Sequence, residues 1–246
     1  MKLLLLSDAR VGDAISEWLL ENYPADIGAI VTLRENAVCT AAREKGIPAF
    51  AIESEFQLQS ALAALAPFNL GILAWWPRLI SPAVIGLAKG GFINTHPSLL
   101  PYNRGKHYNF WALVEQAPFG VSLHFVDEGI DSGDIVAQQA IPYDWEDTGE
   151  TLYAKAGLAM VELFKSAYPQ IRSGSIRRIP QDANQGSLHY AREIDAASTI
   201  DLDKHYTARE LINLLRARTF QGHPACRFME NGETFEITVN IKRKSV

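Results

Sequence analysis

Cysteine is scarce in this chain: Cys39 and Cys226 are its only two, and they lie far apart in the sequence. Two cysteines cannot build a disulfide framework, so we expect free thiols and a reducing, cytoplasmic environment. Basic residues are also few, because 23 Lys and Arg against 28 Asp and Glu give a net charge of −5. That balance argues against a nucleic-acid partner, which normally meets a basic surface. A small anionic substrate remains compatible with it, since a few arginines can set the potential of one cleft.

A long hydrophobic run is missing as well. The leucines at positions 3–6 form a run that Asp8 and Arg10 interrupt. The run is therefore too short for a signal peptide or a membrane span. We expect a buried first strand and no membrane association.

The turn after this strand, residues 7–13, contains a single glycine, Gly12. A dinucleotide site at this place needs several glycines, so that backbone N–H groups can approach a pyrophosphate. Dependence on NAD or ATP is therefore poorly supported. Arg10 in the same turn is either a contact for an anionic substrate or a solvated loop arginine.

Apolar runs alternate with helical patterns, and 246 residues with 48% hydrophobic content can bury a full-sized core. Strands are predicted over residues 3–7, 28–33, 49–52, 70–76 and 91–94, separated by helices around 14–20, 39–45, 56–65 and 82–89. After Pro97 the patterns predict a helix over 108–116, strands over 120–126 and 135–143, and a helix over 151–164. The alternation indicates an α/β fold with a Rossmann-like open, mostly parallel sheet.

The expected organisation is a main domain over residues 1–170, a polar linker over 171–187 and a small α+β C-terminal appendage over 188–246. The appendage is predicted to hold one helix, 208–218, and a β-hairpin of 228–230 against 235–239. Asn231-Gly232 between the two strands is a strong signal for a two-residue turn. Because an exposed hairpin offers an edge for self-pairing, we expect a homodimer.

The most informative residues lie between positions 94 and 134. Asn94-Thr-His96-Pro follows an apolar strand, and Asp127-Glu-Gly-Ile-Asp131-Ser-Gly-Asp134 follows another. An amide can steady a developing oxyanion, an imidazole can move a proton, and a carboxylate can orient that imidazole. This set indicates acyl transfer and needs no metal ion.

These motifs, with Arg104-Gly105 between them, resemble the folate-dependent formyltransferase family, which includes glycinamide ribonucleotide, methionyl-tRNA and amino-sugar formyltransferases. The resemblance covers roughly residues 1–165 and makes residues 1–170 the catalytic domain. It implies 10-formyltetrahydrofolate as co-substrate and a catalytic trio of Asn94, His96 and Asp131. Asn94 would donate to the oxyanion, His96 would pass a proton from the attacking amine toward the leaving nitrogen, and Asp131 would orient His96.

The resemblance also implies the folate contacts. In relatives, the loop that matches residues 127–134 and the segment that matches 76–80 close over the pterin. Candidates on this side are Arg78, Leu79, Ile80, His124, Val126, Asp127, Gly129 and Asp134. Ile80 and Val126 would act through their main chains, while Asp127, Gly129 and Asp134 are also natural loop-formers. His124 is either near the folate or a packed strand histidine.

The acceptor is inferred from departures within the family. A tail of about sixty residues on an acidic chain argues against tRNA, and the first turn lacks the glycine- and serine-rich phosphate loop of the glycinamide ribonucleotide members. Residues 74–78 and 101–111 look most like nucleotide-sugar N-formyltransferases, which act on dTDP-linked amino-deoxysugars of surface polysaccharides. The expected substrate contacts are then Arg10 and Arg78 on the pyrophosphate, and Arg104, Lys106 and Tyr108 beside the acceptor.

Alternatives stay open at this point. Trp75, Trp76 and Trp111 are better explained as core residues, and Arg104 is explained equally well as an anchor of its loop. The acceptor could be another small amine such as glycinamide ribonucleotide, or water, as in formyltetrahydrofolate deformylases, although those usually carry an N-terminal regulatory module. A non-catalytic folate-binding module is disfavoured because it has no need of the whole trio. The sequence does not identify the sugar, the amine position, the base or a role for residues 170–190.

Overall fold

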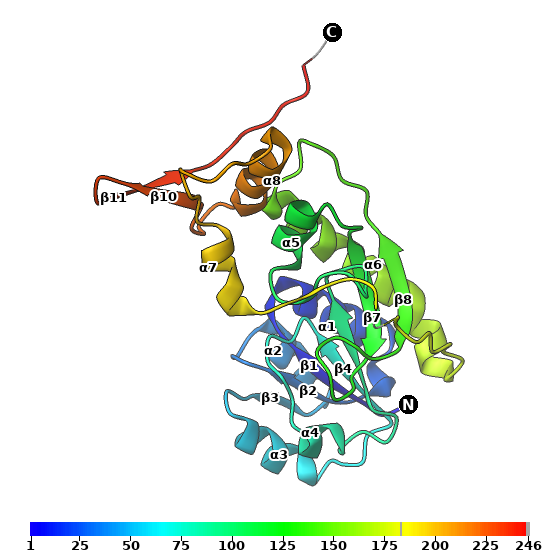
Figure 1. Cartoon of the computed structure of the whole chain (residues 1–246). Coiled ribbons are helices and arrows are strands. Elements are labelled where there is room, and N and C mark those ends of the chain that lie inside the picture. Colours follow the sequence, from blue (N-terminus) through cyan, green and yellow to red (C-terminus); the bar gives the residue numbers. More distant parts are fainter. Residues whose placement is uncertain (183, 245–246) are drawn as a thin grey trace.

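The computed structural model describes residues 1–182 and 184–244. Its centre is a seven-stranded sheet in the order β3-β2-β1-β4-β5-β7-β8 (Figure 1). The strands are β1 (Leu3–Ser7), β2 (Ile27–Thr32), β3 (Ala49–Ala51), β4 (Leu70–Ala74), β5 (Phe92–His96), β7 (Gly120–Phe125) and β8 (Ile135–Ala140). The first five strands of this order pair in parallel, whereas β7 pairs antiparallel with both of its neighbours, β5 and β8. The predicted Rossmann-like, mostly parallel sheet is confirmed.

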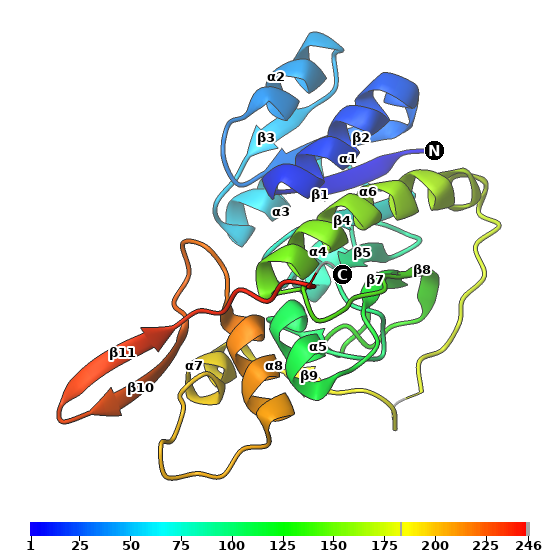
Figure 2. The same ribbon diagram turned by 90° about the horizontal axis from the view of Figure 1, so that it is seen from above.

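Helices cover both faces of this sheet. They are α1 (Ala9–Asn22), α2 (Ala37–Glu44), α3 (Glu55–Ala63), α4 (Pro82–Ile85), α5 (Tyr108–Glu115) and α6 (Gly149–Ser173), with a 3₁₀ turn η1 (Pro24–Asp26). Leu3 and Leu5 of β1 pack with α1, α2 and α6, while Leu4 and Leu6 point to the opposite face. Because successive strand residues alternate between faces, a continuous leucine run serves both cores. Figure 2 shows α1 and α6 lying along the same face.

Two helices differ from their predicted lengths. The helix expected over 82–89 is a single turn, α4, that ends at Ile85. By contrast, α6 continues past the predicted end at residue 164 to Ser173 and stops at Gly174, whose φ is 74°. Ala167, Tyr168 and Ile171 keep the helical spacing of buried positions over this extension. The helix therefore runs beyond residue 170, where we placed the end of the main domain.

The C-terminal region contains β9 (Leu188–His189), a 3₁₀ turn η2 (Ala191–Glu193), α7 (Ile194–Ala197), α8 (Ala208–Arg218) and the hairpin β10 (Cys226–Glu230) and β11 (Glu233–Ile237). The expectation of one helix was wrong, because the short α7 precedes α8. The predicted hairpin is confirmed: Asn231 and Gly232 have φ of 50° and 83°, as the mirror-image turn requires. It projects away from the sheet (Figures 1 and 2).

Residues 174–189 are more than a connection. Ile179 pairs with Ile135 at the start of β8, and β9 pairs in parallel with β6 (Arg104–Gly105). This segment therefore lies beside the two loops that hold the motif residues. Within the part of the chain that the structure describes, no helix combines the length and the apolar character needed to cross a membrane.

Candidate active site

The strands β5 and β7 bring the motif residues together. Their antiparallel register places Asn94 directly opposite His124 and His96 opposite Ser122. Asn94 and His96 are two residues apart and so share a face of the sheet. Asp131 comes from the loop between β7 and β8, which folds back over the end of β5. The chain thus gathers an amide, two imidazoles and a carboxylate.

Asp131 is the centre of this group. Its Oδ1 atom accepts from the Asn94 amide nitrogen at 3.3 Å and lies 3.4 Å from His124 Nε2, while Oδ2 lies 3.3 Å from His96 Nδ1. The backbone N–H of Gly105 donates to Oδ2 at 3.0 Å. The predicted trio therefore lies within hydrogen-bond or near hydrogen-bond range, with His124 as a fourth member.

Electrostatics keep Asp131 ionised. Burial by itself would raise the pKa of its carboxyl, but the attraction of His96 and His124 when they are protonated, together with the Gly105 N–H, outweighs burial and holds that pKa well below its usual range. Burial lowers the pKa of His96, against the opposing attraction of Asp131. Because Asn94 and Gly105 donate to the carboxylate whatever the charge of His96, we describe the pair at neutral pH as an ionised Asp131 beside a neutral imidazole.

The contacts of the two imidazoles indicate their tautomers. His124 Nδ1 donates to the Phe125 carbonyl at 2.8 Å, so its Nε2 accepts from the Asn94 amide at 3.1 Å. His96 Nδ1 faces Asp131, and its Nε2 lies 3.4 Å from the Asn103 carbonyl. In its neutral form, His96 keeps its proton on the side of the carboxylate and leaves Nε2 able to take one up. Tyr108 packs edge-on against this ring, with centroids 5.9 Å apart.

The loop that carries Asp131 is held by its own side chains. Asp127 Oδ1 accepts from the Gly129 N–H at 3.0 Å and the Ser132 hydroxyl at 2.8 Å. The Asp134 carbonyl accepts from the Phe125 N–H at 2.8 Å, and the Val126 N–H donates to the Phe92 carbonyl at 2.8 Å. A folate contact through the Val126 main chain would therefore have to use its carbonyl oxygen. These residues shape the loop, as the sequence indicated for Asp127, Gly129 and Asp134.

The segment 76–80 lines a different part of the surface. Arg78, Leu79 and Ile80, with Trp76, border a small cavity of about 80 Å³ that Ile52, Glu53, Ser54 and Leu58 complete. The Arg78 guanidinium donates to the Glu53 carbonyl. Leu79 is 84% exposed at the edge of this cavity. The segment therefore borders a pocket of its own, and the part of this pocket in folate binding stays a prediction.

The predicted acceptor residues come from three parts of the chain, and of these Tyr108 packs against the His96 ring. Arg10 is exposed in the first turn of α1. Lys106 is exposed and its ammonium donates to the Pro77 carbonyl at 3.4 Å, which links it to the segment 76–80. Arg104 keeps a buried Nε that has no hydrogen-bond partner among the described residues. Among the same residues, no three His, Cys, Asp or Glu are arranged to hold a metal ion.

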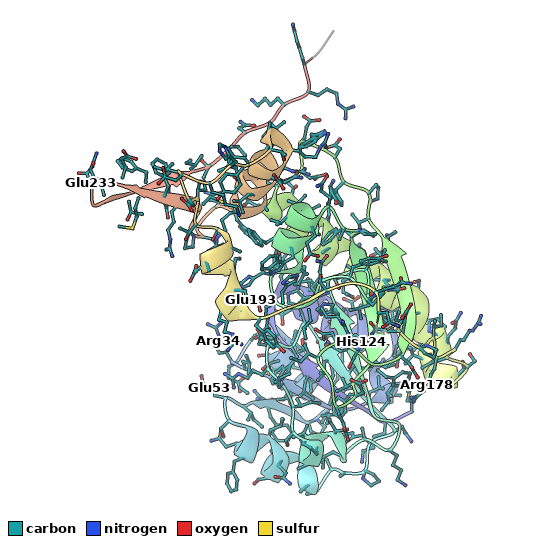
Figure 3. The ribbon with its side chains drawn as sticks, viewed as in Figure 1. Arg34, Glu53, His124, Arg178, Glu193 and Glu233 are labelled. Atoms are coloured by element: carbon teal, nitrogen blue, oxygen red, sulfur yellow. The ribbon has the colours of Figure 1, made fainter. Side chains whose placement is uncertain are left out.

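The sequence did not single out three groups that contact the trio. They are the Gly105 N–H on Asp131, the Asn103 carbonyl beside His96, and the Gln181 amide, which donates to the carbonyls of Asp131 and Gly133. Contacts made through the main chain leave no pattern in a sequence. Of these three groups, only Gly105 stood in a motif, Arg104-Gly105, that the sequence had marked. Figure 3 shows the labelled His124 within the main body and Glu233 far away on the hairpin.

Two protein-family models match this chain. Residues 10–167 match the model of a family described as formyl transferase, and residues 193–243 match an N-formyltransferase dimerisation C-terminal domain. The methionyl-tRNA formyltransferase of Anaeromyxobacter sp. (strain K) is 36% identical over 159 residues, which are 63% of this chain and 51% of that protein. The chain thus spans about half the length of the curated relatives it matches.

Solved structures resemble the chain over more of its length. A 4-N formyltransferase from Francisella tularensis superposes with a TM-score of 0.80 at 23% identity, covering 99% of this chain and 98% of its own. An N-formyltransferase from Helicobacter canadensis, in complex with folinic acid and dTDP-3-aminofucose, gives 0.72 at 20% identity, covering 94% and 85%. At these identities the likeness establishes a common fold, including the C-terminal region.

Proposed function

This chain belongs to the formyl transferase family, and we propose that it moves a formyl group from 10-formyltetrahydrofolate to the amine of a nucleotide-linked amino-deoxysugar. The observation that carries the proposal is the meeting of Asn94, His96 and Asp131 at the end of β5. Strand β5 and the distant loop between β7 and β8 supply the proposed oxyanion donor, base and orienting acid at one place. When bound, 10-formyltetrahydrofolate supplies the formyl carbon that the amine attacks.

His96 is the proton carrier of the proposed mechanism. Its neutral Nε2 takes the proton that the amine nitrogen loses as the new N–C bond forms, and then returns it to the leaving nitrogen as the old C–N bond breaks. Asp131, 3.3 Å from Nδ1, stabilises the imidazolium that exists between the two transfers. Burial of His96 lowers its pKa and so favours the neutral form at the start.

Asn94 is the proposed donor to the oxyanion. Its amide nitrogen already donates to His124 at 3.1 Å and to Asp131 at 3.3 Å, so both of its hydrogens are engaged. One of these hydrogen bonds must be given up when negative charge develops on the formyl oxygen. Removing one such donor typically lowers turnover by about 10²- to 10³-fold.

The choice of a nucleotide sugar rests on the residues around the trio and on the C-terminal region. Arg10, Arg104 and Lys106 supply positive charge on an otherwise acidic chain, as a pyrophosphate requires. One of the solved structures that superpose over nearly the whole of both chains is a 4-N formyltransferase, and the one from Helicobacter canadensis contains a dTDP-sugar. We propose dTDP as the nucleotide, with Arg78 and Arg10 as pyrophosphate contacts.

We also propose that two copies pair through the hairpin of β10 and β11. The region that contains it matches a dimerisation domain. Met229 and Phe235 on the hairpin are 65% and 41% exposed, which leaves apolar surface for a second copy to cover. The division into a catalytic domain over 1–170, a linker and an accessory region over 188–246 stays a proposal.

One assay tests the function. Purified protein is mixed with 10-formyltetrahydrofolate and, in turn, dTDP-linked 3-amino and 4-amino deoxysugars, a UDP-linked amino sugar, glycinamide ribonucleotide and methionyl-tRNA. We expect release of tetrahydrofolate and a formylated product only with an amino-sugar nucleotide, and none with a His96→Asn protein. Release without any acceptor would instead identify a hydrolase, and formylation of methionyl-tRNA alone would overturn the proposal.

A further inference from the structure

The segment between α6 and α7 contacts the site at several points. We call residues 176–182 and 184–189 the strap. Ile179 and Ile135 exchange two backbone hydrogen bonds, of 2.8 and 3.0 Å. The Arg178 guanidinium lies 3.6 Å from the centre of the Phe125 ring, next in sequence to His124; both Arg178 and His124 are labelled in Figure 3. The strap is thus fixed along the edge of β7 and β8, close to where the Asp131 loop begins and ends.

Gln181 of the strap holds the backbone of that loop. Its amide nitrogen donates to the Asp131 carbonyl at 2.9 Å and to the Gly133 carbonyl at 2.7 Å, which uses both of its hydrogens. Asp131 itself has a φ of 50°, in the left-handed region that a residue with a side chain seldom adopts. Such a conformation persists where the surroundings impose it. The two hydrogen bonds from Gln181 are a direct constraint of this kind.

The C-terminal end of the strap fixes the other contact of Asp131. The backbone carbonyl of Ser187 accepts from the Arg104 N–H at 3.0 Å, and that of His189 accepts from the Lys106 N–H at 2.9 Å. Between them stands Gly105, whose N–H donates to the Asp131 carboxylate at 3.0 Å. The strap therefore holds the backbone of Asp131 in place, and it also holds the Gly105 N–H that donates to the Asp131 carboxylate.

We propose that Gln181 is a positioning residue for formyl transfer: its amide clamps the peptide of Asp131 in the left-handed conformation and so holds the carboxylate against His96. The effect on turnover rests on the proposed function, whereas the effect on the geometry of His96 and Asp131 does not. Gln181 touches no reacting atom in this account. It acts through the loop alone.

The test compares Gln181→Met with Gln185→Met. Methionine keeps the length of glutamine but has no donor. Gln185 on the same segment is exposed, and among the described residues its amide donates to Asp182 alone, at 3.0 Å. For Q181M we expect kcat to fall at least about tenfold, with KM for both substrates within about twofold, because a carboxylate displaced by a fraction of an ångström orients His96 poorly. Q185M should match the wild type in both parameters.

A second readout needs no substrate. The His96 imidazole is titrated by NMR in the free protein, where it faces Asp131, His124, Lys106 and the Tyr108 ring. Because the negative charge of Asp131 favours the imidazolium, Q181M should lower the midpoint of His96 by about 0.5 unit or more, and Q185M should leave it unchanged.

Unchanged turnover together with an unchanged His96 midpoint in Q181M would overturn the inference. A wild-type protein inactive with every acceptor would refute the proposed function, and the titration would still decide the role of Gln181. If Q181M is not folded, Gln181→Glu replaces it. Glutamate has the size of glutamine, but its carboxylate cannot donate to the carbonyls of Asp131 and Gly133. Turnover and titration like the wild type in Q181E would likewise overturn the inference.

Discussion

The Nδ1 atom of His96 lies 3.3 Å from the Oδ2 atom of Asp131, and the two side chains are only 6% and 15% exposed. A buried ionisable pair of this kind makes both stability and turnover depend on pH. Burial acts on the two groups in different ways: His96 is pushed toward its neutral form, while the donors around Asp131 keep that residue charged.

Stability should fall as the solution is acidified below pH 6.5. The pKa of His96 is lowered in the folded state from 6.5, so the stabilisation is complete above 6.5 and is lost as pH falls through the lower folded value. We expect the Tm of the wild type to decline as the pH falls below 6.5, because the unfolded chain then binds a proton that folded His96 does not. Thermal unfolding followed by circular dichroism measures this decline.

His107 has a pKa lowered by burial too, so it must be separated from His96. Carboxyls with lowered pKa, including Asp131 and Asp147, lose their contribution only below 3.8 and do not act in this window. The decline of Tm with falling pH should therefore be less steep in both His96→Asn and His107→Asn, because each substitution removes the contribution of one histidine. A slope in His96→Asn equal to that of the wild type would contradict the assignment.

Asp131→Asn should abolish most of the turnover without unfolding the protein. The asparagine Oδ1 can still accept from the Gly105 N–H, but the charge that stabilises protonated His96 is gone. We expect kcat to fall about 10²- to 10⁴-fold, as when the orienting acid of other imidazole bases is neutralised. Steady-state assays with the amino-sugar nucleotide measure the loss.

Glu128→Gln is the matched control for this substitution, because Glu128 is exposed in the same loop and its change removes the same charge. It should keep kcat within about twofold of the wild type, since exposed charges interact weakly. Equal losses in both variants would show that loop charge, and not contact with His96, is responsible.

Gly105→Ala should damage the site more than Gly46→Ala, although both glycines have positive φ, of 86° and 72°. A Cβ at Gly105 would collide with the His189 carbonyl, whereas at Gly46 nothing lies within 4 Å. Both variants bear the cost of the left-handed conformation, about 1 kcal/mol. Only G105A should also separate β6 from β9 and withdraw the N–H from Asp131. Tm values and kcat measured side by side reveal the difference, and equal effects would exclude the collision as its cause.

The hairpin should control the oligomeric state. We expect the wild type to elute with a mass twice 27.2 kDa in size-exclusion chromatography with light scattering, and a Met229→Glu, Phe235→Glu double variant to elute as a 27.2 kDa monomer. Charges placed on an apolar contact oppose its burial. Leu158→Glu, at a leucine on α6 that is 73% exposed, should remain dimeric. A monomeric wild type at micromolar concentration would refute the pairing.

Much of the fold could be predicted from local patterns. The ends of β1 and α8 agree with the prediction to the residue, because an uninterrupted apolar run marks the first and the Thr207–Glu210 capping box starts the second. The length of α6 was underestimated because Pro169 lies inside its last turns, and a proline, which has no backbone N–H to donate, usually marks the end of a helix. The four residues of α7 are too few to show a period.

The site was only partly accessible from the sequence. Resemblance to a family pointed to Asn94, His96 and Asp131, and the antiparallel register of β5 and β7 explains why His124 joins them. Gln181 had no such signal, because both of its partners are backbone carbonyls. A glutamine in a polar stretch looks the same whether it faces water or a strained turn.

The strap limits how such a protein can be recombined with its relatives. A chimera joined at residue 170 would exchange Gln181 and β9 along with the tail, and would leave the Asp131 loop to partners that did not evolve with it. A junction placed after His189 keeps the loop and its supports in one parental piece. The better junction for exchanging C-terminal regions therefore lies beyond β9, and not where the long helix ends.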